Sequence, residues 1–326
     1  TFNAAKSHVF SIPVDGGDRA AITSRPHNHF APTLSQDGSM WAYVSDDNGT
    51  IDVWVQPAAG GDAFNLTKSR GDSGQPAWAP DGSKLLYVSD RNGSGEIFVV
   101  GADGTGEALL ITSEGDDFAP TWSPDGSGFA FVSDRMDGDS DLYIASAAGG
   151  DVQRLTSMGG VGGVQWSPDG SAISFTSQNT PSGQAQLFVI SAGASEPRAL
   201  TSEGYNAGGV WSPDGSKILF GRHSGVGFDL AELDVASGEI TVIASADAWE
   251  VGGVYSPDGQ WIAFQGNMEG NFELYVMPAT GGEPRRITTT DADENLVDWT
   301  PDGALYYTTA EGDTNLWYMD VESALP

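Results

Sequence analysis

Histidines are the side chains of this sequence best suited to binding a transition metal. His27 and His29 are separated by one residue, and His223 follows much later in the chain. Imidazole nitrogens bind transition metals, and carboxylates close by could complete the coordination shell. The alternative is that these residues are solvated loop histidines.

An acidic loop between residues 134 and 141 is a candidate for binding calcium. Its carboxylates alternate with other residues on both sides of Gly138. Calcium prefers such oxygen ligands, although the loop lacks the twelve-residue frame and bidentate glutamate of an EF-hand. An exposed acidic hairpin is the alternative. The predicted calcium ligands are Asp134, Asp137, Asp139 and Asp141.

A repeated Ser-Pro-Asp-Gly turn determines where these loops lie in the fold. A repeat period of about 40–45 residues with four short apolar runs per unit is typical of a β-propeller. Seven copies predict an all-β chain forming a single propeller of seven four-stranded blades over residues 1–326. The aspartates of the copies, spaced by 44 or 45 residues, are Asp37, Asp81, Asp125, Asp169, Asp214, Asp258 and Asp302.

The third unit shows how each blade is predicted to form. Strands are expected near residues 120–123, 128–133, 141–144 and 152–155, with the Pro, Asp and Gly placed as a type I turn requires. The large residue that ends each first strand, aromatic in every unit but the first, is predicted to pack between adjacent blades.

The two ends of the chain are predicted to close the ring by pairing with each other. Residues 19–23 resemble a fourth strand without a blade of its own, and the last unit stops after its third strand. Pairing them would remove an exposed sheet edge. Residues 9–14 are a second candidate for that third strand, so either one strand lies outside the sheet or the native chain is longer. Residues 1–18 are thus an extra strand or the remnant of a longer chain.

Three phrases together resemble one propeller family. Trp-Ser-Pro-Asp-Gly is followed by Val-Ser-Asp-Arg at residues 88–91 and 132–135, and units close with Leu-Thr, as at residues 155–156. This pattern resembles the periplasmic TolB-type propellers and the propeller domains of prolyl oligopeptidases and dipeptidyl peptidases. The resemblance implies the fold, whereas the family includes binding scaffolds, peptidase gates and lyases such as oligogalacturonate lyase. The chain has neither the amino-terminal α/β domain of TolB-type proteins nor the Gly-x-Ser-x-Gly elbow of the peptidases.

The ligand site is predicted where two sets of loops share one face of the propeller. One set joins each fourth strand to the next first strand, and the other joins second to third strands. The residues that break the repeat are the preferred candidates there, and no catalytic residue is assigned. The predicted ligand-binding residues are His27, His29, Phe30, Asp72, Arg91, Asp117, Arg135, Tyr205, Arg222, His223, Trp249 and Glu250.

Composition limits the partners and the compartment. The 45 acidic residues against 14 Lys and Arg give a formal charge of −31, which disfavours nucleic acid and anionic membranes. Cysteine is absent, which excludes disulfides and thiol catalysis. A start at Thr1 without an apolar signal core predicts a processed protein that is secreted or periplasmic, with a cut chain as the alternative. The acidic, lysine-poor surface also suits a saline environment.

The leading functional hypothesis is a non-enzymatic, exported scaffold that binds a protein or glycan partner through its acidic loop face. Calcium is the one cofactor considered, and self-association is an open alternative. A second hypothesis is a substrate-gating propeller of a prolyl oligopeptidase-like serine peptidase. A third is a metal-dependent sugar lyase.

Overall fold

A computed structural model shows a chain built from β-strands. It describes residues 9–12, 20–21, 29–47, 49–68, 71–136, 138–191, 193–223, 225–289, 291–299, 304–311 and 313–320. Within these ranges no helix is long and apolar enough to span a membrane.

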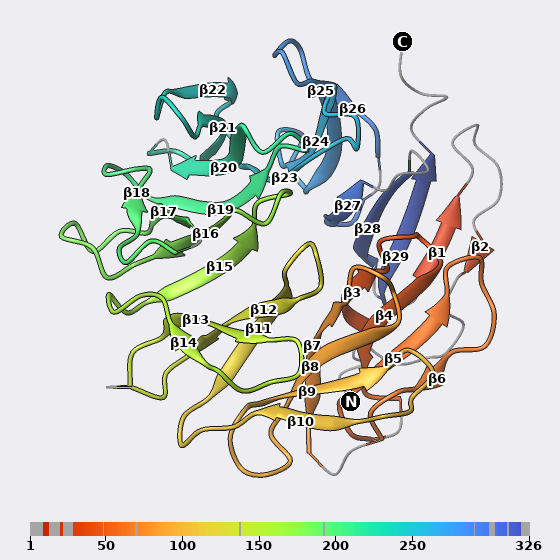
Figure 1. Cartoon of the computed structure of the whole chain (residues 1–326). Coiled ribbons are helices and arrows are strands. Elements are labelled where there is room, and N and C mark those ends of the chain that lie inside the picture. The colour runs from red at the N-terminus through yellow and green to blue at the C-terminus, as the bar shows by residue number, and fades with distance from the viewer. Residues whose placement is uncertain are drawn as a thin grey trace, which may run out of the picture. The chain divides into compact units, whose positions relative to one another are not determined.

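The chain forms two compact units, residues 27–199 and residues 1–26 together with 200–326. The first unit contains four antiparallel sheets, each built from four strands that follow one another in the chain (Figure 1). These are β3 (His29–Leu34), β4 (Met40–Ser45), β5 (Asp52–Pro57) and β6 (Phe64–Asn65); β7 (Ser73–Trp78), β8 (Lys84–Ser89), β9 (Glu96–Gly101) and β10 (Ala108–Ile111); β11 (Asp117–Trp122), β12 (Gly128–Ser133), β13 (Asp141–Ser146) and β14 (Gln153–Arg154); and β15 (Val161–Trp166), β16 (Ala172–Ser177), β17 (Gln186–Ser191) and β18 (Arg198–Ala199).

The second unit contains two sheets of the same kind and a third, larger one. Its strands are β19 (Asn206–Trp211), β20 (Lys217–His223), β21 (Phe228–Asp234) and β22 (Ile240–Ala244); β23 (Glu250–Tyr255), β24 (Trp261–Gly266), β25 (Glu273–Pro278) and β26 (Arg285–Arg286); and β27 (Glu294–Trp299), β28 (Ala304–Glu311), β29 (Asp313–Asp320), β1 (Val9–Ile12) and β2 (Ala20–Ala21).

The prediction of seven four-stranded blades is wrong. Six sheets have four strands, whereas the remaining sheet has five, in the order β2-β1-β29-β28-β27. β1 lies parallel to β29, with Phe10 opposite Trp317, and β2 pairs with the other edge of β1. The two candidate third strands, β1 and β29, therefore belong to one sheet. In it, β1 lies between β29 and β2, the strand predicted as the fourth. Pairing of the two terminal segments is observed, and closure of the ring stays a prediction.

The Ser-Pro-Asp-Gly turn has the hydrogen bond between its first and fourth residues that often closes a β-turn. In the third sheet the Gly126 amide donates to the Ser123 carbonyl over 2.9 Å. Asp125 Oδ1 accepts from the Ser123 hydroxyl at 2.7 Å and from the Ser127 amide and hydroxyl at 3.0 and 2.8 Å. These bonds favour the ionised carboxylate and lower the pKa of Asp125 to about 2. The repeated aspartate is therefore a structural residue that fastens its own turn.

Aromatic residues pack between neighbouring sheets of the first unit, as predicted. Trp122 and Phe129 form one buried cluster with Leu86 and Ile97 of the preceding sheet. The Trp122 indole N–H also donates to the Ala77 carbonyl of that sheet over 3.2 Å. Second strands read as continuous apolar runs because neighbouring sheets cover both of their faces.

The first strand of each sheet in residues 27–199 lies at one end of the strand order and carries a bulge. At the bulge, Ala31, Gln75 and Ala119 have φ values of 48, 53 and 50°. Such left-handed conformations in residues other than glycine store strain and recur beside ligand sites. Gln75 Oε1 accepts the Ala119 amide proton at 2.6 Å, so the bulge of β7 is tied to that of β11.

Candidate functional site

The loop end of the sheets is held together by a repeated hydrogen bond from a backbone amide to a side-chain oxygen. Asp90 Oδ1 accepts the amide proton of Asp72 at 2.8 Å, and Asp134 Oδ1 accepts that of Asp116 at 2.7 Å. In the second unit, Asn267 Oδ1 accepts the amide proton of Trp249 at 2.8 Å. In each case the acceptor follows a second strand and the donor precedes a first strand. The two sets of loops therefore meet, as the sequence predicts.

Arg91 and Arg135 contact partners within their own sheets. Arg135 Nη2 lies 2.6 Å from Asp117 Oδ1, and the Asp117 side chain is fully buried. Arg91 Nη1 lies 3.0 Å from Glu107 Oε2, whose side chain is 37% exposed. Both guanidinium groups also lie over aromatic rings. These arginines stabilise the blades, and their binding of an outside ligand stays a prediction.

The predicted calcium ligands have different surroundings. Asp134 Oδ1 accepts the amide proton of Asp116, as described above, whereas Asp139 is exposed and Asp137 lies outside the described residues. Asp141 is buried, and it accepts from the Thr156 hydroxyl at 2.7 Å and from Arg154 Nη2 at 2.6 Å. Among the described residues, no group of three or more His, Asp or Glu could hold a metal ion. A calcium site in this loop stays a prediction.

Two predicted ligand residues of the first unit line a shared hollow at the loop end. Phe30 and Asp72 belong to the wall of a cavity of about 360 Å³ that also includes Gln75 and Asp90. His29 is buried, with its ring edge-on to Tyr43 at a centroid distance of 5.0 Å. His27, the other member of the predicted histidine pair, lies outside the described residues.

Several predicted residues of the second unit gather around one aromatic ring. Tyr205, His223 and Trp249 lie with their ring centroids 5.8, 5.3 and 5.0 Å from that of Phe228. Arg222 lies opposite Asn206 in the register of β19 and β20. Phe228 is buried, whereas Trp249 is 44% exposed. Sequence reasoning missed Phe228 because it reads as an ordinary strand residue.

Glu250 is a buried acid beside this cluster. Its side chain is 1% exposed, and its Oε2 atom has no hydrogen-bond partner. Burial, followed by the nearby negative charge of Asp229, raises the pKa of Glu250 to about 7, against a hydrogen bond from the Ala246 backbone. A carboxyl group that titrates near neutral pH is suited to binding a cation or a proton.

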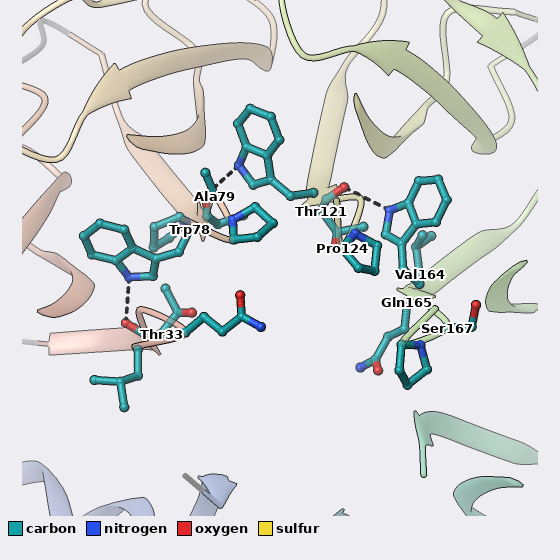
Figure 2. Close-up of a pocket in the computed structure, with 16 residues that line it drawn as sticks. Thr33, Trp78, Ala79, Thr121, Pro124, Val164, Gln165 and Ser167 are labelled. Carbon is teal, nitrogen blue, oxygen red and sulfur yellow. Dashed lines mark hydrogen bonds between the residues drawn. The ribbon is translucent and has the colours of Figure 1, made fainter. Parts of the chain in front are cut away.

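A larger hollow opens at the opposite, turn end of the first strands in residues 27–199. Its volume is about 560 Å³, within the range of small-molecule sites. Figure 2 shows the indoles that contribute to its wall, each fixed by a hydrogen bond to the preceding sheet. Trp78, Trp122 and Trp166 donate to the carbonyls of Thr33, Ala77 and Thr121, each over 3.2 Å.

The lining of this turn-end hollow is neutral. None of its described lining residues is charged, although the whole chain carries a formal charge of −31. Apolar contacts come from the indoles and from prolines such as Pro76 and Pro124, and the polar groups are hydroxyls and the amides of Gln36 and Gln165. The aspartates of the repeated turns follow lining residues directly in the chain. Their carboxylates, however, accept hydrogen bonds from the serine hydroxyls of their own turns.

The turn-end hollow was not predicted from the sequence, which assigned ligand binding to the loop end. One signal was available, because Gln36 replaces the proline of the repeated turn and therefore breaks the repeat. Gln165 gave no comparable signal, since the residue before the first-strand aromatic varies among the units.

Comparisons with known proteins support the fold. Oligogalacturonate lyase from Vibrio parahaemolyticus is 13% identical, with a TM-score of 0.76 and 94% of each chain covered. The β-propeller domain of the Trilobed protease from Pyrococcus furiosus is 14% identical, with a TM-score of 0.69 and coverage of 91% of this chain and 96% of that one. TolB from Acinetobacter baumannii is 23% identical, with a TM-score of 0.59 and coverage of 87 and 67%. At these identities the likeness shows the fold alone.

The family assignment comes from the sequence match. A comparison with curated proteins finds no significant relative. The family model described as TolB beta propeller domain matches residues 1–117 and 105–251, which is more than half of the chain. The chain therefore belongs to the TolB β-propeller domain family.

Proposed function

We propose that this protein is a binding module that holds an uncharged peptide segment of a partner protein in the turn-end hollow. The observation that carries the proposal is the neutral lining of this hollow in a strongly acidic chain. Desolvating charged side chains on binding is costly, so a site without them suits a ligand without net charge.

The wall chemistry favours a peptide over a sugar. Sugars stack on exposed aromatic faces, but Trp78 and Trp122 are only 9 and 6% exposed, and their indole N–H groups are already bonded. Gln36 and Gln165 are exposed, and each amide can donate to and accept from a peptide backbone. Pro124 and Pro168 are exposed and Trp166 is partly exposed, so these rigid side chains would supply apolar contacts without a large loss of side-chain entropy.

Selection of binding peptides tests this proposal. A phage-displayed library of random peptides is selected on the immobilised protein, and the affinity of the selected peptides is measured by calorimetry. We expect peptides that are poor in charged residues of either sign and that bind at least tenfold more weakly to Gln36→Glu and Gln165→Glu, since each change places a carboxylate on the lining.

Gln178→Glu is the matched control, because Gln178 is an exposed glutamine at the loop end of β16 and the substitution adds the same charge. Peptide binding should be unchanged in this variant. Equal binding to all four proteins, or cleavage of the selected peptides by the purified protein, would exclude the proposed role. The peptidase-gating and sugar-lyase alternatives and an exported location stay predictions.

A further inference from the structure

The sheets β11–β14 and β23–β26 carry different residues at two equivalent positions near their loop ends. Asp117 lies opposite Ser133 in the register of β11 and β12, and Glu250 lies opposite Gly266 in the register of β23 and β24. Arg135 follows Ser133 by two residues, and Met268 follows Gly266 by two. Glu250 therefore stands in the place of Asp117, while a methionine stands in the place of the arginine.

Arg135 contacts a carboxylate and the faces of two aromatic rings in its own sheet. Its Nη2 atom lies 2.6 Å from Asp117 Oδ1. Its guanidinium carbon lies 5.3 Å from the ring centroid of Phe131 and 5.1 Å from that of Tyr143. These two rings are stacked at 5.6 Å. The sheet thus combines a buried carboxylate, a stacked ring pair and a guanidinium group, an arrangement that satisfies both ion pairing and cation–π attraction.

The sheet β23–β26 keeps the carboxylate and the rings but has Met268 in the place of Arg135. Its own Arg286 pairs with Glu273, where Nη2 lies 2.5 Å from Oε1. Phe264 and Tyr275, the equivalents of the ring pair, are stacked at 5.6 Å with 20° between their planes. Glu250 is 1% exposed, its Oε2 atom has no hydrogen-bond partner, and no described residue forms a salt bridge with it. The charged group beside it is Asp229, which has the same sign. Burying a carboxylate without a cation is costly, so this site is suited to binding a cation that comes from another molecule.

We propose that Glu250 and the Phe264–Tyr275 pair bind a guanidinium group from outside the chain, that of an arginine side chain in a partner protein. A guanidinium group is preferred to an ammonium group because the equivalent position of the β11–β14 sheet holds one over the same kind of ring pair. Met268 is half-buried and lies across Gly266. Its flexible, unbranched side chain can rotate away to admit the ligand.

Trp249 supplies an optical signal beside the site. It precedes Glu250 in the chain and is 44% exposed, so a ligand bound at Glu250 should change its fluorescence. This site lies within residues 200–326 and does not depend on the turn-end hollow of residues 27–199. Failure of either proposal therefore leaves the other standing.

The test compares three small probes on the whole protein by calorimetry and tryptophan fluorescence. N-acetyl-arginine amide carries the guanidinium group, N-acetyl-citrulline amide is its neutral analogue, and N-acetyl-lysine amide carries an ammonium group. We expect binding of the arginine probe, at least tenfold weaker binding of the lysine probe, and no binding of the citrulline probe. Equal affinity for citrulline would overturn the site, and equal affinity for lysine would overturn the guanidinium assignment.

Variants show whether the probe binds at Glu250. Glu250→Gln should weaken arginine binding at least tenfold, and Met268→Arg should do the same because the new side chain occupies the site. Glu239→Gln is the matched control, since it removes the same charge from an exposed turn of the same unit. If Glu250→Gln does not fold, Met268→Arg still decides, because an unchanged affinity in that folded variant would contradict the proposal.

Discussion

Carboxylates of this chain differ widely in their proton affinity, and their partners explain why. Asp125 and its equivalents accept hydrogen bonds from serine hydroxyls and backbone amides, which lower the pKa of Asp125 to about 2. Glu250 has lost contact with water and lies near Asp229, so its pKa is raised to about 7. The first kind of carboxylate stays ionised at any ordinary pH, whereas the second titrates near neutrality.

The titration of Glu250 should make stability depend on pH. Its pKa in the folded protein, about 7, lies above its ordinary value of 4.5, so between these values the folded state binds more protons than the unfolded state. The free energy of unfolding should therefore fall as pH rises from 4.5 to 7, by about 1–2 kcal/mol after allowance for solvent screening. Urea unfolding of wild type and Glu250→Gln at pH 5 and pH 8 measures this term, which should vanish in the variant. An identical pH slope in both proteins would contradict the assignment.

Removing the cation from the β11–β14 sheet should be costly. Arg135→Met leaves the fully buried Asp117 without its ion pair, and loss of one partner of a buried pair typically costs about 3–5 kcal/mol. The 17% exposure of Arg135 suggests the lower end of that range. Arg91→Met is the comparison, because the partner of Arg91, Glu107, is 37% exposed. This variant should lose about 1 kcal/mol or less of its free energy of unfolding. Chemical denaturation of both variants gives the two costs, and similar values would contradict the role of burial.

At the scale of the elements, close approach of two loops limits the residues between them. A Cβ atom added at Gly115 would overlap Asp134 Oδ1 and lie 2.9 Å from the Arg135 amide nitrogen. Gly115→Ala should therefore push the two loops apart and destabilise the protein by roughly 1–3 kcal/mol. Gly162→Ala in β15 is the control, since the new Cβ atom would lie 4.0 Å from Thr176 Oγ1, an ordinary contact distance. Thermal melts should show a loss only for Gly115→Ala.

Local features of the elements could be predicted from sequence, but longer-range ones could not. The Ser123–Gly126 turn depends on neighbouring residues, and the packing of Trp122 follows from a large aromatic residue that ends the first strand in six of the seven units. The insertion of β1 beside β29 depends on segments at opposite ends of the chain, and two similar strand patterns competed for one place. The turn-end hollow depends on which side chains four sheets bring together, and a residue such as Gln165 carries no local sign of that role.

At the scale of the whole molecule, the excess of acidic residues should make stability depend on salt. The 45 acidic residues and 14 Lys and Arg repel one another on balance, and dissolved salt screens such repulsion. Raising sodium chloride from 10 to 500 mM should raise the melting temperature by roughly 2–5 °C. Choline chloride should act alike at equal ionic strength, since screening does not depend on the cation. Circular dichroism measures the melting temperature, and an unchanged or lower value at high salt would contradict this expectation.

The parallel contact between β1 and β29 has a consequence for biosynthesis. Each four-stranded sheet is made from one continuous stretch of chain, so its strands can pair soon after they leave the ribosome. Phe10 cannot meet Trp317 until all the residues between them have been polymerised. β1 is therefore made long before its partner β29, and until β29 is made the pairing edges of β1 are open to chaperones or to other nascent chains.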